Sequence, residues 1–310
     1  MLSRTADHIY WLGRYVERAE TLARALDVQF RLSLLPQPAQ SIAAGWLDTL
    51  DELGLLPEYR ERHGEVDADQ PMRFVAWDRE SFGSIHGCLR LARENARAVR
   101  GAITAEMWET LNATWLELRA GAQRAAGFGE FIDWVKHRSQ LLRGVLTGTM
   151  LRDEGYAFVR MGMSLERADG TARILGARLA SASGGTVAGS TLQWSVLLRA
   201  MSAFENYRKL FRDAVVPERV AELLVLHDAD PRSLRRSVDE LYANLKVVAN
   251  QHSRETERRA GELDAMLRFG RAESLGAGRL RGFLDDCVER LRDIDRRISS
   301  DFLVAAEQAA

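Results

Sequence analysis

A 14-residue motif occurs twice in this chain. Residues 13–26 read GRYVERAETLARAL and residues 162–175 read GMSLERADGTARIL, with seven identical positions at an offset of 149 (13 to 162). The shared pattern is Gly-x-x-x-Glu-Arg-Ala, then an acid, then two positions and Ala-Arg-x-Leu. A long pattern repeated at one fixed spacing predicts an internal duplication, and it limits the chain to architectures built from two copies of one unit.

The offset continues beyond the motif. Around the first copy, apolar residues recur every three or four positions, which is the stripe of an amphipathic helix. They are Ile9, Leu12, Val16, Ala19, Ala23, Leu26 and Phe30, and their counterparts are Phe158, Met161, Leu165, Ala168, Ala172, Leu175 and Leu179. Further matches are Ser84 with Ser233, Asn95 with Asn244, and Glu106 with Glu255. Two unrelated helices with a shared Glu-Arg-Ala bias do not explain one offset in several segments. The sequence therefore predicts an all-α helical bundle of two tandem pseudo-symmetric repeats, residues 1–150 and 151–310, packed as one unit.

Start and stop signals divide the chain into helices. Ser3 is a candidate N-cap of the first one, Pro217 and Pro231 fit first-turn positions, and no alternating strand pattern is present. The segment from Gly54 to Pro71 is expected to be a loop, and residues 181–185 a flexible one after the second motif helix. Besides the second motif helix, the predicted helices are 3–34, 40–53, 81–100, 104–125, 131–150, 191–214, 218–226, 231–250, 255–267 and 279–302.

Composition excludes several classes of partner. The net charge is −1 with 28% charged residues, so no single-sign field points to nucleic acid or to an anionic membrane. Cys88 and Cys287 are predicted to be reduced thiols rather than a disulfide. The first residues contain no apolar stretch of a signal peptide, and no apolar run is long enough to span a membrane. We expect a cytoplasmic protein with neither nucleic acid nor membrane as a partner.

Motifs for cofactors and metals are absent from the sequence. None of the six histidines follows a glutamate by three residues, which excludes the usual di-iron spacing, and no paired Cys-x-x-Cys or phosphate-binding loop occurs. The glycine-rich run at 183–190 has neither a preceding strand nor a lysine, and a linker explains it better. The sequence predicts no cofactor and no metal.

The Glu-Arg pairs of the motif are the candidate site. Glu17 and Arg18 lie on either flank of the apolar stripe, which alone predicts solvated charges. Tyr10 and Trp11 on the far face favour a helix covered on two sides, where buried charges need a partner or a ligand. Structural ion pairing and direct ligand contact both remain open, because the two look alike in sequence.

Other charged residues of the motif favour structural roles. Glu20 with Arg24, and Asp169 with Arg173, are spaced for helix ion pairs. Gly13 and Gly162 are unfavourable inside a helix, so we expect another backbone to approach them closely, such as that of the other motif helix across a pseudo-twofold axis. The arginines at 90, 93, 97 and 100 form a stripe that is either a solvated face or a surface for an acidic peptide.

Several segments together resemble the bacterial alpha-E proteins. They are MLSR at 1–4, YWLGRYVERAE at 10–20, RENARAVR at 93–100, MLRDEGY at 150–156 and LERAD at 165–169. The resemblance covers nearly the whole chain and places the Glu-Arg motif of the family on Glu17, Arg18, Glu166 and Arg167. It implies association with circularly permuted ATP-grasp proteins and with transglutaminase-like proteins, beside or fused to them, in systems that make or modify peptides.

Two functions follow as hypotheses. The first is a helical accessory or substrate-binding component of an ATP-grasp amide-ligase system, with a peptide or an amino acid as a possible ligand. The second is an enzyme in which Glu17 and Glu166 act as acid and base while Arg18 and Arg167 hold a carboxylate. A shared pocket between the motif helices favours the enzyme, and two separate exposed pairs favour the accessory role. Further candidate binding residues are Tyr10, Arg14, Arg93, Asn95, Arg97 and Arg160.

Overall fold

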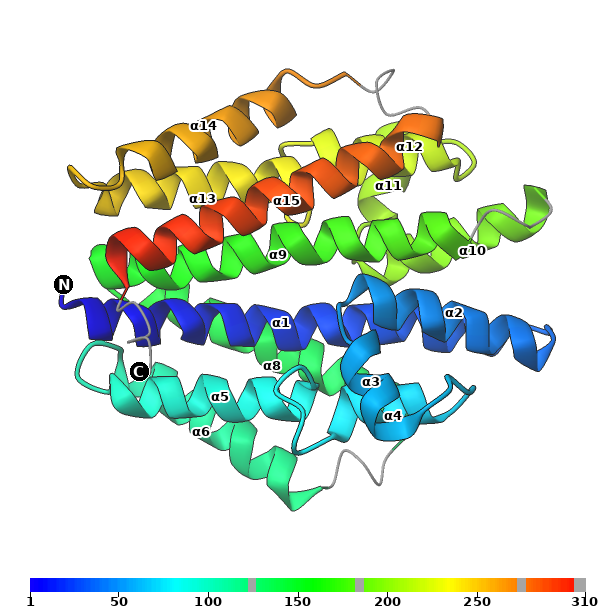
Figure 1. Ribbon diagram of the computed structural model, residues 1–310, viewed down its shortest axis with the longest axis horizontal. Coiled ribbons are helices and arrows are strands. Elements are labelled where there is room, and N and C mark those ends of the chain that lie inside the picture. Colours follow the sequence, from blue (N-terminus) through cyan, green and yellow to red (C-terminus); the bar gives the residue numbers. More distant parts are fainter. Residues whose placement is uncertain (122–126, 182–186, 272–276, 304–310) are drawn as a thin grey trace.

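Two long helices form the centre of the molecule. The computed structural model describes residues 1–121, 127–181, 187–271 and 277–303, and these residues contain helices and no strand. Helix α1 (Ser3–Ser33) lies beside α9 (Glu154–Ser181) along most of its length (Figure 1). These are the two motif helices, and the all-α prediction is confirmed.

The remaining helices follow in the same order in each half. The first half has α2 (Ala39–Glu52), α3 (Leu56–His63), α4 (Gln70–Trp77), α5 (Ile85–Ala98), α6 (Ala105–Ala120) and α8 (Phe128–Thr149). The second has α10 (Val187–Ala200), α11 (Phe204–Phe211), α12 (Pro217–Ala221) with a π-helical turn (Glu222–Leu226), α13 (Leu234–Val248), α14 (Arg254–Arg268) and α15 (Ala277–Phe302). Adding 149 to the first residues of α5, α6 and α8 (85, 105, 128) gives those of α13, α14 and α15 (234, 254, 277). The helix order thus follows the predicted offset, while a spatial pseudo-symmetry of residues 1–150 and 151–310 stays a prediction.

Each half covers its own motif helix and part of the other one. Helix α1 packs against α5 and α8, and α9 packs against α13 and α15. In addition, α2 packs on α9 and α10 packs on α1. The motif helices are therefore covered on several sides, and the apolar stripe is buried on both apart from its half-buried last positions, Phe30 and Leu179.

The two glycines of the motif lie where α1 and α9 approach most closely. A Cβ added to Gly13 would overlap the carbonyl oxygen of Val159, and one added to Gly162 would overlap that of Tyr10. These contacts are reciprocal, because Tyr10 and Val159 occupy matching positions of the two copies (10 and 159). The expectation that another backbone approaches both glycines is confirmed.

Some predicted helix bounds are wrong. Residues 54–71 are not all loop: α3 lies within them because Leu56 and Tyr59 are buried, and burial outweighs the local charges and glycines. Ser3 does not cap α1, whose N-cap is Leu2 without a side-chain hydrogen bond. Residues 191–214 do not form one helix, because Ser202 has a positive φ of 57° between α10 and α11.

Proline and loop predictions had mixed outcomes. Pro217 begins α12 as expected. Pro231 lies before α13, whose N-cap is Ser233, with its hydroxyl accepting a hydrogen bond from the Arg236 amide. Ser84 caps α5 in the same way through the Gly87 amide. Residues 122–125 and 182–185, predicted as a helix end and as a flexible loop, lie outside the described residues.

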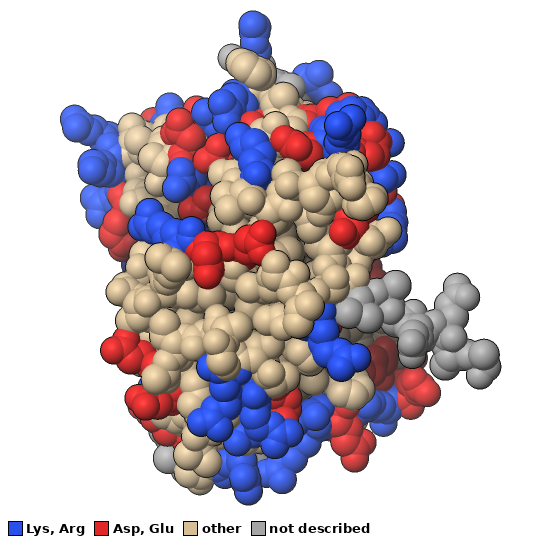
Figure 2. Space-filling model, turned by 90° about the vertical axis from the view of Figure 1, so that its left-hand side faces the viewer, with Lys and Arg blue, Asp and Glu red and all other residues tan. Residues whose placement is uncertain are grey.

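The cysteines and the surface of the molecule agree with several expectations. Cys88 and Cys287 are buried free thiols. Figure 2 views the end of the molecule where α1 begins, and a broad band of uncharged residues lies there between charged ones. Below this band basic residues gather. Arg97 of α5 is well exposed, as the interpretation of a solvated face expects. Within the described residues, no helix combines the length and apolar character needed to cross a membrane.

Candidate functional site

The carboxylate of Glu17 is completely buried and is bound by arginines from three other segments. Arg167 of α9 donates two hydrogen bonds to it, from Nε to Oε1 at 2.9 Å and from Nη2 to Oε2 at 2.8 Å. Arg143 of α8 donates to Oε2 at 3.2 Å, and Arg232, just before α13, donates to Oε1 at 3.3 Å. Two parallel bonds from one guanidinium are the strongest form of this contact, so Arg167 is the principal partner of Glu17.

Glu166 occupies the matching position of the second motif and pairs in the opposite direction. Arg18 of α1 donates to its Oε1 at 2.6 Å and to its Oε2 at 3.0 Å, and Arg14 donates to Oε2 at 2.6 Å. The glutamate of each motif therefore binds the arginine of the other motif. Such reciprocal contacts are what the predicted pseudo-symmetry of the two halves would produce.

Glu20 is a second buried carboxylate beside Glu17. Arg24 donates to its Oε1 from Nε at 3.0 Å and from Nη2 at 2.7 Å, which confirms the predicted helix ion pair. Arg143 and Arg232 bind Glu20 as well as Glu17. The corresponding Asp169–Arg173 pair also forms, at 2.6 Å, but both of its side chains are partly exposed. The predicted pairs are thus real, and the one on α1 belongs to a buried cluster.

These partners determine the charge of the glutamates. Burial alone would raise the pKa of Glu17, but Arg167 and Arg143 lower it well below its usual range. The pKa of Glu166 falls to about 2, because Arg18 and Arg14 outweigh the effect of burial. Both carboxylates are therefore ionised at neutral pH and are saturated with hydrogen bonds from guanidinium groups.

The buried contacts of Glu17, Glu20 and Glu166 with their arginines form one set, the motif network. Tyr10 and Arg14 extend this network toward α15. The Tyr10 hydroxyl donates to Asp295 at 2.6 Å, and Arg14 Nη1 donates to the same carboxylate oxygen at 2.5 Å and to the Tyr10 oxygen at 3.2 Å. Arg14 therefore bridges Glu166 and Asp295. Of the predicted binding residues, these two lie in the motif network.

The other predicted binding residues have separate contacts. Arg93 donates to Asn112 of α6 at 2.9 Å, and Arg97 pairs with Glu94 at 2.9 Å. Asn95 lies 2.8 Å from the His8 ring nitrogen, and Arg160 pairs with Glu240 of α13. Arg93, Asn95 and Arg160 thus join neighbouring helices, whereas the Arg97 pair lies within α5. All of these partners lie outside the Glu17 and Glu166 clusters.

Comparison with known proteins identifies the family. A family model described as a predicted alpha-helical domain with a conserved ER motif matches residues 1–303. The chain belongs to the Alpha-E family. Uncharacterised proteins from Mycobacterium bovis and from two Mycobacterium tuberculosis strains share 24% identity with it over 332 aligned positions. The alignment covers 99% of this chain but 37% of each relative, so the chain spans little more than a third of their length. No solved structure matches the chain.

The structure distinguishes the Alpha-E motif from other Glu-Arg pairs. The sequence contains six such pairs, at 17, 61, 166, 218, 257 and 289. Only at 17 and 166 is the glutamate buried, and both of those positions lie on the central helices. Burial, rather than the dipeptide itself, sets these two pairs apart.

Three members of the network carry no sequence signal. Arg143, Arg232 and Asp295 lie 126, 215 and 281 residues from their partners Glu17 and Arg14. Neither a repeat nor a helix spacing relates them to the motif. The sequence also left open a shared pocket or two separate exposed pairs. The pairs are neither separate nor exposed, because they cross between α1 and α9 and their glutamates are buried.

The arrangement limits the chemistry available. Among the described residues no group of three or more His, Cys, Asp or Glu side chains is placed to hold a metal ion. A general base works best with a pKa near the working pH, whereas the pKa values of Glu17, Glu20 and Glu166 are all lowered. The network is suited to joining helices rather than to moving protons.

Proposed function

We propose that this chain is a helical accessory or substrate-binding component of an ATP-grasp amide-ligase system for peptide synthesis or modification in the cytoplasm. The observation that carries the accessory role is the crosswise pairing of Glu17 with Arg167 and of Glu166 with Arg18. The motif side chains satisfy one another, so they stabilise a scaffold and need no substrate to neutralise them.

The alternative is an enzyme of the same pathway that uses these pairs for acid–base chemistry on a carboxylate or amide. It requires a glutamate that exchanges protons near neutral pH and a route for the substrate to reach it. Glu17 is fully buried, and Arg167, Arg143 and Arg232 already bind its carboxylate. These contacts favour the accessory role.

The size of the relatives supports a function alongside other domains. The Mycobacterium proteins contain this region as 37% of their length, so in them it is accompanied by further sequence. The main partner that we propose is a circularly permuted ATP-grasp protein, and a transglutaminase-like protein and a peptide or amino-acid substrate are further candidates. The resemblance to the family is the source of these partner classes.

Exposed apolar residues supply a surface for such a partner. Leu2 and Leu151 are 79% and 77% exposed. Both lie at the end shown in Figure 2, since the Met1 amino group contacts Glu154 at the start of α9. Contiguous apolar surface is typical of protein interaction sites, and we propose that these two leucines belong to one.

A reconstituted reaction tests the proposal. The chain is incubated with the circularly permuted ATP-grasp protein of its organism, ATP and candidate peptides, and peptide masses are measured with and without each protein. We expect amide-bond formation to require the ATP-grasp protein and to increase when this chain is added. A mass change produced by this chain alone would favour the enzyme, and no effect of the chain on any product would contradict the accessory role.

A further inference from the structure

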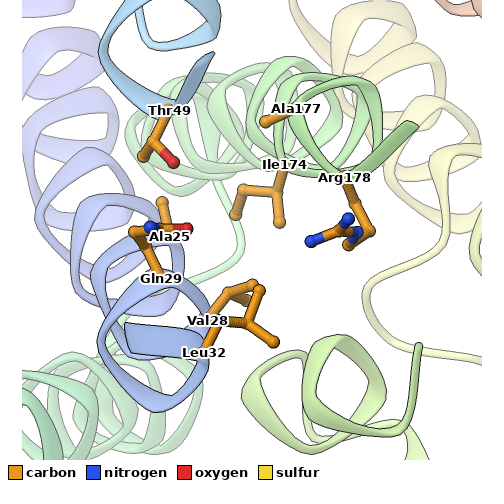
Figure 3. A pocket seen from close by; sticks show the side chains of 8 residues that line it. All are labelled: Ala25, Val28, Gln29, Leu32, Thr49, Ile174, Ala177 and Arg178. Atoms are coloured by element: carbon orange, nitrogen blue, oxygen red, sulfur yellow. The ribbon is translucent and has the colours of Figure 1, made fainter. Parts of the chain in front are cut away.

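A second buried site lies between the C-terminal parts of α1 and α9, separate from the motif network. A small cavity opens there, and Figure 3 shows its side chains. They are Ala25, Val28, Gln29, Leu32, Thr49, Ile174, Ala177 and Arg178. Most of these are aliphatic, and they come from α1, α2 and α9.

Arg178 is the unusual member of this lining. Its side chain is only 4% exposed, yet its Nε and Nη2 atoms are buried and have no hydrogen-bond partner among the described residues. Figure 3 shows the guanidinium directed into the cavity, toward Val28 and Leu32 of α1. A buried charge with two unsatisfied donor atoms is unfavourable, and a bound anion would satisfy them.

Other buried arginines show what Arg178 lacks. Arg14, Arg24 and Arg167 are buried to a similar degree, and each donates Nε to a carboxylate at 2.6 to 3.0 Å. The acidic group that acts on Arg178 is Asp48 of α2, which raises the pKa of the guanidinium. Burial has the larger effect and lowers this pKa to about 10, so Arg178 still carries its charge at neutral pH.

The neighbouring polar groups already have partners within the protein. The Thr49 hydroxyl donates to the carbonyl oxygen of Gly45 at 2.8 Å, and the Gln29 amide nitrogen donates to that of Ile42 at 3.3 Å. Gln29 occupies the position in the first copy that Arg178 has in the second (29 and 178). The duplication has thus left a cation on one side of the cavity and a neutral amide on the other.

The dimensions and chemistry of the cavity define the ligand. Its free space is about 20 Å³, which exceeds the roughly 10–15 Å³ that one water occupies and allows one small group. A planar guanidinium matches a carboxylate through two parallel hydrogen bonds. A phosphate dianion would bring two charges to a single cation among aliphatic walls, which is unfavourable.

We propose that this cavity binds the carboxylate group of a small molecule with a short aliphatic chain, held by Arg178. The carboxylate takes up the free space beside Arg178, and the chain of the ligand extends from it past the aliphatic lining toward the opening of the cavity. The site consists of this protein's own residues and does not depend on the proposed partner. Amide formation consumes carboxylates, so such a site would also suit an amide-ligase system, but either proposal can fail without the other.

Nitrogen-15 NMR of arginine side chains in the full chain tests the site. Acetate is the probe, acetamide is the neutral control of the same shape, and sodium chloride controls for ionic strength. The Arg178→Met variant identifies the Arg178 Nε signal by its loss. We expect acetate to shift that signal saturably. The variant should bind acetate at least about tenfold more weakly, as loss of a charged hydrogen bond predicts. Exposed Arg152→Met is the matched control and should leave acetate binding unchanged.

The result that overturns the proposal is independent of the variant. If acetate and acetamide shift the Arg178 signal equally, or if neither does, the cavity does not select a carboxylate. If chloride saturates the same shift at the same concentration as acetate, the site binds an adventitious ion only. Thermal unfolding of Arg178→Met, where loss of an unpaired buried charge should not lower the melting temperature, confirms that the variant is folded.

Discussion

The carboxylate of Glu17 and the guanidinium of Arg167 form two parallel hydrogen bonds across the α1–α9 interface, although 150 residues separate them in the chain. Arg18 and Glu166 repeat the contact in the opposite direction. The motif therefore acts between its two copies. Each copy supplies the opposite charge for the other, so a substitution in one motif removes the ion-pair partner of a residue on the other motif helix.

Removal of the Glu17 charge tests this interpretation most directly. Glu17→Gln preserves the shape of the side chain and leaves Arg167 without its anion, while Arg143 and Arg232 keep Glu20 alone. Because the pair is buried, we expect the free energy of unfolding to fall by about 3–5 kcal/mol. Urea unfolding at neutral pH measures it. The control is Glu255→Gln, at a pair with Arg258 on the surface of α14, where no resolvable loss is expected. Equal stability of Glu17→Gln and the parent would show that the buried pair is not structural.

A double-mutant cycle tests the crosswise contact in the second motif. We expect Glu166→Gln and Arg18→Met to be coupled by about 0.5–3 kcal/mol, because Glu166→Gln leaves Arg18 without its carboxylate and Arg18→Met leaves Glu166 with Arg14 alone. The loss in Glu166→Gln should be smaller than in Glu17→Gln, since Arg18 is 31% exposed and water can solvate it. Urea unfolding of the two single variants and the double variant gives the coupling. Additive effects would show that Arg18 and Glu166 do not interact in solution.

The lowered pKa values predict a loss of stability in acid. A carboxyl whose pKa is lower in the folded than in the unfolded state contributes stability above its unfolded pKa and loses it as the pH falls toward the folded value. For Glu166 the pKa falls from 4.5 to about 2, a difference worth roughly 3 kcal/mol. We expect the free energy of unfolding to change little for this group above pH 5 and to fall between pH 5 and 2. Urea unfolding at a series of pH values should show a shallower decline for Glu166→Gln, and equal slopes for variant and parent would contradict the assignment.

Local patterns predicted much of the fold. The apolar stripes predicted both central helices, the fixed offset predicted the helix order of the second half, and Tyr10 and Trp11 predicted that α1 is covered on a second side. Spacing along one helix also predicted the Glu20–Arg24 pair. Each of these inferences depends on residues close in the chain or on a comparison of the two copies.

Partners from distant segments could not be predicted. Arg143, Arg232 and Asp295 reach the motif through helix packing, and no sequence spacing encodes that contact. The burial of α3 likewise depends on tertiary packing, which outweighed a charged and glycine-containing local sequence. Arg178 follows the second motif by a few residues, yet only the structure shows that its guanidinium is buried, with no hydrogen-bond partner for Nε and Nη2 among the described residues.

The glycine contacts give a prediction that depends on backbone distance alone. Gly13 and Gly162 lie in helix interiors, where alanine is normally favoured by up to about 1 kcal/mol. At both positions the added Cβ would overlap a carbonyl oxygen of the facing helix and approach an amide nitrogen, Met163 at 3.2 Å or Arg14 at 3.1 Å. These are backbone atoms that no rotamer change can move aside. We expect Gly13→Ala and Gly162→Ala to force α1 and α9 apart and to lower stability by about 1–3 kcal/mol each.

Gly144 supplies the matched control for this prediction. It lies inside α8, is exposed, and has no atom within 4 Å of an added Cβ. Gly144→Ala should therefore raise the free energy of unfolding, by up to about 1 kcal/mol, through helix propensity and the reduced entropy of the unfolded chain. The same substitution then changes stability in opposite directions at Gly144 and at the two motif glycines, which urea unfolding resolves. If Gly13→Ala and Gly162→Ala are also stabilising, the motif helices do not approach each other this closely, and the crosswise Glu-Arg contacts, which require that approach, would have to be reconsidered as well.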